Sequence, residues 1–273
     1  MSLAVLLVLA VIQGLTEFLP VSSDGHLALG RLLLGGTRTG LVVELTLHAG
    51  TLIPILVGFG SDWLGIARAP FGRDEEAARK GRRLFGLLVL GTIPAALAGV
   101  LLKDWIESLY PSARAVGGGL LANAVVLAFG ARAARSARRD FDSVGAADVL
   151  VVGLAQAFAL LPGVSRSGVT VTTALARGIA PASAARLSFL LAAPIIAGAC
   201  ALGAFDWARG KDVAEVGGGY LLIGAAVSAV VGAFGLRACL RLVVRNRLPW
   251  LAVYCAVAGL ATVLFVKGSA TAQ

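Results

Sequence analysis

The chain has 273 residues, of which 58% are hydrophobic and 14% charged, and its mean hydropathy is +0.88. Soluble domains carry about 25% charged residues, so this composition excludes an ordinary soluble protein and predicts an all-α integral membrane protein. The net charge of +9 would suggest nucleic-acid binding in a soluble protein. In a membrane protein, Lys and Arg in cytoplasmic loops explain it, and nucleic acid is excluded as a partner.

The first predicted element is a re-entrant hairpin. Residues 3–19 could form a helix of about 25 Å, since an α-helix rises 1.5 Å per residue, and Pro20 ends it. Residues 25–34 are too few to return across a bilayer, which needs about 20 residues. Non-helical backbone at such depth is tolerated only where it is buried in protein or lines a wet cavity. The polar tip, residues 13–26, is therefore the first candidate site.

Six membrane spans and a second hairpin are predicted after this element. The second hairpin has arms near 148–161 and 168–180, each too short to cross, and its polar tip is the segment 161–170. The spans are the long apolar runs 42–60, 84–102, 115–130, 184–204, 217–236 and 249–267. The expected fold therefore has six transmembrane helices plus two re-entrant helical hairpins.

The positions of Lys and Arg predict the orientation. Three loops, 68–83, 132–142 and 237–247, are rich in Arg, whereas acidic residues offset the few basic ones in 103–114 and 205–216. Short loops rich in Lys and Arg stay in the cytoplasm. All three basic loops can be cytoplasmic only if there are six crossings and both hairpins re-enter, which leaves both termini outside.

The two halves of the chain are predicted to form a repeat. Their motif stretches align with a constant offset of 143 residues, so we expect one membrane domain made of repeat 1, about 1–142, and repeat 2, about 143–273. An odd number of crossings between them makes their topologies inverted, and inverted repeats with broken helices place a site where the halves meet. The matching pairs are Gln13 and Gln156, Val21 and Val164, Ser22 and Ser165, and Gly25 and Gly168.

The first polar tip offers oxygen ligands. Gln13 and Glu17 are four residues apart, hence on one face of a helix, and could hold one hard cation, which prefers oxygen. The alternative is that Glu17 caps the helix end or pairs with an arginine. Asp24 could add a third oxygen or, as we favour, cap the helix that begins near Gly25, since Asp is a preferred N-cap.

Ser22, Ser23 and His26 place hydroxyl groups beside an imidazole. A serine needs a neighbouring base to become a useful nucleophile, and histidine titrates in the right range. The alternative is that these side chains only satisfy backbone groups. His48, the other histidine of the chain, lies within the first span and is expected to be a packed or hydrogen-bonding residue.

Arg166 lies at the tip of the second hairpin, far from the cytoplasmic arginines. An arginine fork binds phosphate in bidentate fashion. Ser165, Ser167 and Thr170 add donors, and the neighbouring glycines let backbone amides approach an anion. The alternative is a structural ion pair with Glu17 across the interface of the two halves. Either interpretation brings the two motifs together.

Both motifs resemble those of a known family. The segment Gln13-Gly-Leu-Thr-Glu-Phe-Leu-Pro-Val-Ser-Ser-Asp-Gly-His26 resembles the first motif of the undecaprenyl-diphosphate phosphatases, the bacitracin-resistance proteins. The segment Pro162-Gly-Val-Ser-Arg-Ser-Gly-Val-Thr170 is similar to their second motif. The stretch 185–194 also looks like the family, and the resemblance covers the whole chain in length and order of segments.

The resemblance implies an enzyme that hydrolyses a polyprenyl diphosphate to the monophosphate and inorganic phosphate. It implies action at the outer, periplasmic side of the cytoplasmic (inner) membrane, where the carrier lipid of cell-wall synthesis is recycled. The partners would be this lipid and the bilayer, with a homodimer left open. The alternative class is a membrane transporter or lipid flippase, for which the same architecture is natural, although it would not need Ser and His beside a phosphate-binding arginine.

Carried over by position, the resemblance assigns a role to each residue of the two motifs. Glu17, His26 and Arg166 would be catalytic, with Ser23 a candidate nucleophile. A Mg²⁺ or Ca²⁺ ion would lie near Gln13 and Glu17. The predicted substrate-binding residues are Ser22, Ser165, Arg166, Ser167 and Thr170.

The chain departs from the family's pattern at two positions. Position 13 is often Glu in the family, and the neutral Gln13 is a weaker cation ligand. Position 24 is usually Ser or Thr, and we infer that Asp24 restores the charge lost at Gln13.

Overall fold

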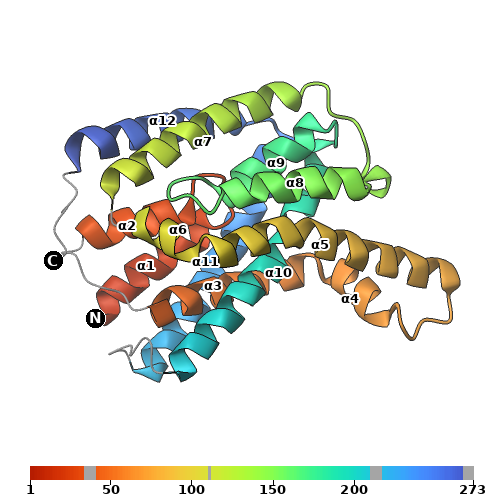
Figure 1. The fold of residues 1–273 in the computed structure, drawn as a ribbon, viewed down its shortest axis with the longest axis horizontal. Coiled ribbons are helices and arrows are strands. Elements are labelled where there is room, and N and C mark those ends of the chain that lie inside the picture. The colour runs from red at the N-terminus through yellow and green to blue at the C-terminus, as the bar shows by residue number, and fades with distance from the viewer. Residues whose placement is uncertain (34–40, 110–111, 210–216, 267–273) are drawn as a thin grey trace.

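The structure is a computed structural model that describes residues 1–33, 41–109, 112–209 and 217–266. Within these ranges the chain folds into α-helices and one short 3-10 turn, with no strand (Figure 1). The elements are α1 Leu3–Thr16, α2 Ser23–Leu33, α3 Leu41–Gly58, α4 Gly60–Arg68, α5 Glu75–Leu101, α6 Lys103–Leu109, α7 Ala113–Ala133, η1 Phe141–Ser143, α8 Ala146–Phe158, α9 Arg166–Ala176, α10 Pro181–Ala208, α11 Gly218–Val244 and α12 Leu248–Phe265.

The long apolar helices confirm the multi-pass membrane protein that the composition predicts. In the described part of the chain, five helices are long and apolar enough to cross a bilayer: α5, α7, α10, α11 and α12. The apolar α3 and the following α4 are bent by 79° at a short break and count together as a sixth span. Each of the six predicted spans thus has a helix, and the first one turns sharply at its end.

Several predicted boundaries were wrong, because charged residues were assigned to loops. The helix α5 begins at Glu75, well inside the predicted 68–83 loop, where the Asp74 side chain accepts hydrogen bonds from two backbone N–H groups and caps it. The helix α11 runs to Val244, into the predicted 237–247 loop. Glu, Lys, Arg and Ala are good helix formers, so these helices continue beyond their apolar part into the charged segments.

Both predicted hairpins are present as pairs of short helices, α1–α2 and α8–α9. The base of the second hairpin is held in one place, since Arg139 donates to the carboxylate of Asp148 at the start of α8 and to the carbonyl of Arg177 after α9. The chain therefore enters and leaves at the same end. Figure 1 shows the first hairpin extending from the opposite end, so that the two tips meet near the middle. The inverted relation of the two halves stays a prediction.

Hydrogen bonds between separate segments hold the basic loops close to one another. Arg83 donates to the carbonyls of Asp142 and Val144, and Asn246 donates to the carbonyl of Ala131. At the opposite end, Lys103 and Asp206 form an ion pair of 3.1 Å. The three basic segments thus lie at one end of the molecule, as their assignment to one side of the membrane requires.

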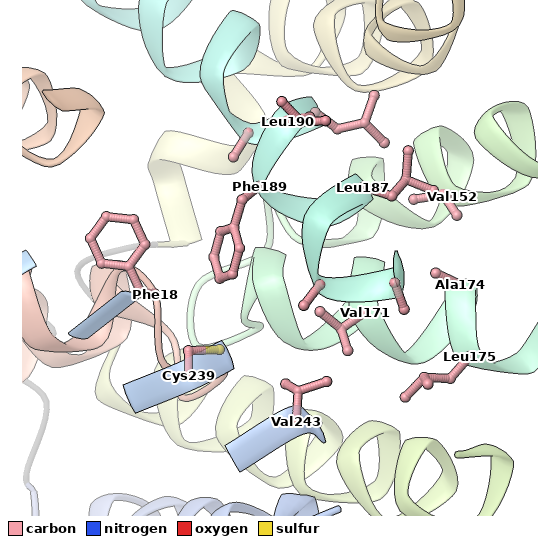
Figure 2. Close-up of a cluster of buried hydrophobic side chains, with 14 of the residues drawn as sticks. Phe18, Val152, Val171, Ala174, Leu175, Leu187, Phe189, Leu190, Cys239 and Val243 are labelled. Atoms are coloured by element: carbon pink, nitrogen blue, oxygen red, sulfur yellow. The ribbon is translucent and has the colours of Figure 1, made fainter. Parts of the chain in front are cut away.

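The largest cluster of buried apolar side chains holds the second hairpin against the long helices (Figure 2). The ring of Phe18, from the tip of the first hairpin, lies 5.8 Å from that of Phe189 in α10. Contributions to this cluster come from α8, α9, α10 and α11: Val152, Val171, Ala174, Leu175, Leu187, Leu190, Cys239 and Val243. The helix α10 therefore packs against both hairpins.

Glycines let the second tip approach α7. A Cβ on Gly119 would lie 2.0 Å from the carbonyl oxygen of Pro162, and one on Gly163 would lie 2.1 Å from that of Val116. Gly163 also has a φ of +86°, in the left-handed region that favours glycine. The backbone of the second tip is thereby fixed directly against a membrane-spanning helix.

Candidate active site

A pocket of ≈ 170 Å³ lies between the two hairpin tips. This volume is well above the roughly 10–15 Å³ that one water molecule needs. Side chains from the first hairpin, α3, the second hairpin and α10 line it: Thr16, Glu17, Ser22, Ser23, Asp24, His48, Ala159, Leu160, Val164, Ser165, Arg166, Ile195, Ile196 and Ala199. Six of the predicted site residues are among them, drawn from both motifs.

Glu17 is the centre of the polar contacts. The hydroxyl of Ser23 donates to Glu17 Oε2 over 2.7 Å, and Gln13 Nε2 donates to the same oxygen over 3.0 Å. Arg166 donates to the other oxygen and forms an ion pair with it. The ion pair of Arg166 with Glu17, which was the alternative to phosphate binding by Arg166, is therefore present. The carboxylate also lies within hydrogen-bond reach of a serine.

A strained turn presents Ser23 to this carboxylate. Ser22 has a φ of +73°, which costs a non-glycine residue about 1–3 kcal/mol. Its hydroxyl accepts from the backbone N–H of Gly25. Ser22 rather than Asp24 thus caps the start of α2, so our preferred role for Asp24 was wrong, because the helix begins at Ser23, two residues earlier than expected. Asp24 lies in the first turn instead.

The helix α9 begins in the same way at the second tip. The hydroxyl of Ser165 accepts from the backbone N–H of Gly168, and Arg166 is the first residue of the helix. The N-termini of α2 and α9 therefore both lie at the pocket. A helix N-terminus favours bound anions through its dipole and its free N–H groups, so two of them plus an arginine suit a phosphate.

Asn123 in α7 joins the two tips, and sequence reasoning missed it. Its fully buried amide donates to the carbonyl of Pro20 over 2.9 Å and accepts from the backbone N–H of Ser165 over 3.2 Å. One side chain thus satisfies a backbone group in each hairpin. An asparagine in a long apolar span was the available signal, because polar groups in lipid are costly unless they are paired.

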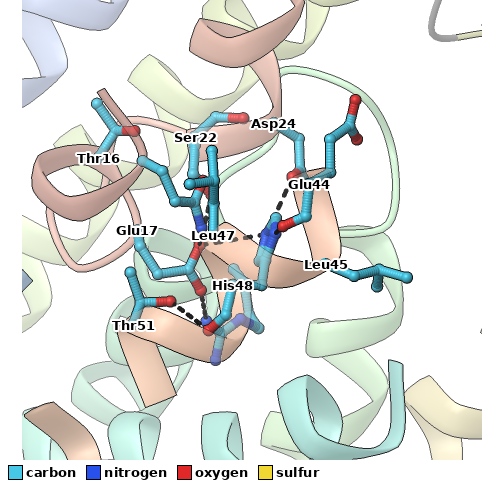
Figure 3. Close-up of polar contacts among 12 residues, drawn as sticks. Thr16, Glu17, Ser22, Asp24, Glu44, Leu45, Leu47, His48 and Thr51 are labelled. Carbon is cyan, nitrogen blue, oxygen red and sulfur yellow. Dashed lines mark hydrogen bonds and ion pairs between the residues drawn. The ribbon is translucent and has the colours of Figure 1, made fainter. Parts of the chain in front are cut away.

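His48 also belongs to the pocket, although we expected only a packed or hydrogen-bonding residue. Figure 3 shows it between Glu17 and Asp24. Its Nε2 lies 3.6 Å from Glu17 Oε2 and 3.5 Å from Asp24 Oδ1, while Nδ1 is 2.8 Å from the carbonyl oxygen of Glu44. Since a carbonyl only accepts, Nδ1 carries the proton and Nε2 faces the carboxylates. Two of the predicted metal-binding carboxylates therefore share a histidine neighbour.

Four of the predicted site residues do not line the pocket. The ring of His26 lies 2.7 Å from the carbonyl oxygen of Ser22 through Nδ1, and 2.7 Å from the hydroxyl of Tyr254 in α12 through Nε2. Thr170 donates to its own helix and contacts the hydroxyl of Ser188 over 2.7 Å. The other two are Gln13, which contacts Glu17, and Ser167, which contacts Ser165.

The residues fit a divalent cation only in part. Gln13 Oε1 is buried and has no hydrogen-bond partner, as a ligand atom would be before binding. Glu17, however, already accepts from Ser23, Gln13 and Arg166. Among the described residues, no group of three or more His, Cys, Asp or Glu side chains could hold a metal. The protein alone therefore does not supply a complete oxygen cage.

The fold and the pocket define a class: a polytopic membrane protein with a pocket that suits an anion and contains a carboxylate–serine pair, between two helical hairpins. Comparison with known proteins narrows this class. The chain belongs to the family of bacitracin resistance protein BacA, whose model matches residues 6–261.

Relatives cover nearly the full length of this chain. A protein of Pelotomaculum thermopropionicum named undecaprenyl-diphosphatase is 38% identical over 260 residues, which cover 94% of each chain. One of Syntrophotalea carbinolica with the same name is 36% identical, over 93% of this chain and 95% of the relative. One of Carboxydothermus hydrogenoformans, again of that name, is 33% identical over 96% of this chain and 97% of its own. The resemblance seen in the motifs is therefore confirmed along the chain.

Proposed function

We propose that this protein is an undecaprenyl-diphosphate phosphatase, which releases inorganic phosphate and leaves the lipid monophosphate. The observation that carries the proposal is the contact of the Ser23 hydroxyl with Glu17, whose second oxygen pairs with Arg166. This gives a nucleophile, a base and a phosphate-binding cation in one pocket. The family and the names of the relatives support the same activity, and no observation favours the transporter or flippase.

The first step transfers the terminal phosphoryl group. The diphosphate enters between the N-termini of α2 and α9, where Arg166 exchanges part of its contact with Glu17 for phosphate oxygens. Glu17 takes the proton of Ser23, whose oxygen forms a bond to the terminal phosphorus. The bond from this phosphorus to the bridging oxygen breaks, and the lipid monophosphate leaves with that oxygen. Positioning and charge stabilisation dominate such reactions.

The second step frees the phosphate. Glu17 first gives the proton it took from Ser23 to the oxygen of the departing lipid monophosphate and is again a carboxylate. A water molecule then attacks the phosphorus of the phosphoserine and loses a proton to Glu17, while the bond from phosphorus to the Ser23 oxygen breaks. This oxygen takes the proton from Glu17, so that inorganic phosphate leaves and Ser23 is restored. In the variant without a covalent intermediate, a water in the place of Ser23 loses its proton to Glu17 and attacks directly. A route through phosphohistidine would need an imidazole nitrogen at the phosphorus.

We assign His26 a positioning role in this scheme. Its contacts with the Ser22 carbonyl and the Tyr254 hydroxyl tie the strained turn to α12. His48, which faces the pocket, is the imidazole nearer to Glu17. This division differs from the catalytic role expected for His26, because the fold turns that ring away from the carboxylate.

A divalent cation stays a proposal. Mg²⁺ is often bound by one or two carboxylates together with substrate phosphates, so Mg²⁺ or Ca²⁺ could bind with the diphosphate at Glu17, Asp24 and Gln13. When bound, it would neutralise charge on the phosphates. The test is chelation: removal of divalent ions from the purified protein should abolish phosphate release, and Mg²⁺ or Ca²⁺ should restore it. Full activity in the presence of a chelator would contradict the requirement for a divalent cation.

The location is also a proposal. Since the basic loops are expected in the cytoplasm, the end of the molecule with the Lys103–Asp206 pair would face outward, and the pocket would open to the periplasmic side of the cytoplasmic membrane. There the activity recycles the carrier lipid of cell-wall synthesis and confers bacitracin resistance. A membrane-impermeant thiol probe should react, from outside intact cells, with a cysteine placed at the exposed Ser108 of α6.

The activity is tested with purified protein in detergent and undecaprenyl diphosphate as substrate. Wild type should release one inorganic phosphate per lipid. Ser23→Ala separates the two routes, since loss to background supports the covalent route and substantial residual release supports attack by water. Thr262→Val is the matched control, because its buried hydroxyl donates only within α12. Absence of phosphate release by wild type would overturn the proposed function.

A further inference from the structure

A second, apolar hollow lies beside the phosphate pocket. It is a groove of ≈ 270 Å³ between the end of α5, the short helix α6 and the end of α8. The described residues that line it are all apolar: Ala98, Leu102, Trp105, Ile106, Ala157, Phe158, Leu160 and Leu161. We call it the α5–α6–α8 groove.

The groove adjoins the pocket. Leu160 lines both of them, and Ala159 lines the pocket between two groove residues, Phe158 and Leu160. The chain at the end of α8 thus forms a thin partition with a polar site on one side and an apolar channel on the other. A ligand with a charged head and an apolar tail could occupy both sides at once.

We propose that the α5–α6–α8 groove holds the first isoprene units of the polyprenyl tail, and that Leu160 marks the point where tail and diphosphate join. The inference rests on the proposed function, which requires such a substrate. Head and tail are covalently linked, so a diphosphate in the pocket must lead its chain out through an apolar wall. The groove adjoins the pocket at such a wall.

The groove lies at the end of the molecule that suits this substrate. It is formed where α5 passes into α6, beside Lys103, whose partner Asp206 lies at the end of α10. This end is opposite to the basic loops. Trp105 is 54% exposed, and Trp side chains favour the membrane interface. The tail would therefore enter from the outer leaflet.

The walls of the groove are held at a fixed spacing. A Cβ on Gly153 of α8 would lie 2.2 Å from the carbonyl oxygen of Gly91 in α5, so these two backbones are in contact. Small residues permit such close approach between membrane helices. Beyond this crossing, Ala98 and Ala157 leave the space that the groove occupies.

The groove should act by aligning the diphosphate with Ser23 rather than by strengthening the binding of the lipid. Lipid chains are as apolar as the groove, so transfer of the tail from bilayer to groove gains little from the hydrophobic effect. A fixed tail instead orients the diphosphate toward Ser23. Since a misplacement of about 1 Å can cost about 10²-fold in rate, blocking the groove should lower kcat/KM.

The test fills the groove from two sides. Ala157→Phe and Ala98→Phe, on different helices, should each lower kcat/KM for undecaprenyl diphosphate by about tenfold or more, and should leave kcat/KM for methyl diphosphate, which has no isoprene unit, within about twofold, as alignment by the groove requires. Ala128→Phe is the matched control. It fills a groove of ≈ 410 Å³ at the basic end, away from the pocket, where Arg132, Arg135 and Asn246 line it beside apolar residues, and should change neither value.

Two results would contradict the assignment of the groove to the lipid tail without contradicting the phosphatase activity. One is wild-type turnover of undecaprenyl diphosphate by both filled variants. The other is an equal loss on both substrates, which would mean that the pocket itself was disturbed. Phosphate release by wild type from neither substrate would instead defeat the proposed function.

A photoprobe tests the groove in the wild-type protein, without any substitution. A three-isoprene diphosphate with a benzophenone on its tail, irradiated with wild-type protein, should label peptides that contain residues 98–106 or 157–161. Excess undecaprenyl diphosphate should prevent the labelling. Labelling confined to α11 or α12 would contradict the assignment.

Discussion

At the first tip the Ser22 hydroxyl accepts from the N–H of Gly25, and at the second tip the Ser165 hydroxyl accepts from the N–H of Gly168. These pairs are 143 residues apart, the offset at which the motifs align. The same cap thus starts α2 and α9, and each helix N-terminus lies at the pocket. The two tips share a backbone device that suits an anion.

The two hairpins differ in the residue that follows the capping serine. After the cap, the first tip has Ser23, which contacts Glu17, whereas the second has Arg166, which pairs with the same carboxylate. In the proposed mechanism, one hairpin supplies the reacting groups and the other supplies the arginine that binds phosphate. The comparison shows how a repeated frame can carry two different halves of one site.

The hairpins also differ in how they are anchored. The second is closed at its base by Asp148, which binds both Arg139 and Arg177. The first has its polar ties to α7 and α12 near the tip, namely Asn123 with Pro20 and His26 with Tyr254. Substitutions at the tips and at the anchors test this division, from the largest expected effect to the smallest.

Arg166→Ala should abolish phosphate release, because removal of one preorganised charge-stabilising donor alone costs about 10²–10³-fold. Arg186→Ala is the matched control, since Arg186 also bridges two helices through a carboxylate, that of Asp62, outside the pocket. Both variants should remain folded in detergent, and only the first should lose turnover. Near-normal phosphate release by Arg166→Ala would remove Arg166 from the mechanism.

Asn123→Leu should lower kcat by at least about tenfold, since it frees both tips and small misplacements are costly. It should also lower the melting temperature, because two buried backbone groups lose a partner at about 1–3 kcal/mol each. Cys255→Ala, which removes a weak acceptor of the same amide, should preserve both values. Wild-type turnover by Asn123→Leu would show that the tips are held without it.

His26→Gln should retain activity within about tenfold, whereas loss of a general base costs about 10²–10⁴-fold. Tyr254→Phe should produce a similar, smaller defect, because it removes the other half of the same contact. The measurement is kcat as a function of pH. An altered pH profile in His26→Gln, but not in Tyr254→Phe, would return His26 to acid–base catalysis.

Asp148→Asn should affect stability and leave catalysis unchanged, since Asp148 lies at the base of the second hairpin, outside the membrane-spanning helices. Hydrogen bonds from Arg139, Gly145 and Arg177 overcome the effect of burial and lower the pKa of Asp148 from 3.8 to about 2. The stabilisation is therefore present above pH about 4 and is lost as the pH falls toward 2. At 1.36 kcal/mol per pKa unit, it amounts to about 2 kcal/mol.

The measurement is thermal unfolding in detergent between pH 2 and 7. Wild type should lose stability across that acidic window, and Asp148→Asn should be less stable at neutral pH with a weaker dependence. Glu76→Gln is the control, because its carboxylate forms an exposed pair with Lys80 and such pairs contribute little. Identical pH dependence in wild type and Asp148→Asn would contradict the anchoring role.

The residue types and their spacing determined much of this protein. Apolar runs of membrane length predicted the spans, and arms too short to cross predicted the hairpins, because burial of the backbone in lipid depends on local length and hydropathy. Polar residues within those apolar hairpins marked Glu17, Ser23 and Arg166 as candidates. The ends of helices in charged segments were predicted poorly. Residues such as Glu75 and Arg241 are hydrophilic, as loop residues are, but they are also good helix formers.

Only the tertiary structure decided which side chains contact one another. It brought Asn123 and His48 to the tips and turned His26 toward Tyr254, because these contacts join segments that are distant along the chain and depend on how the helices pack. It also set the α5–α6–α8 groove beside the pocket through the Gly91–Gly153 crossing. Local sequence thus fixes which groups must be satisfied inside the membrane, and packing between helices selects their partners.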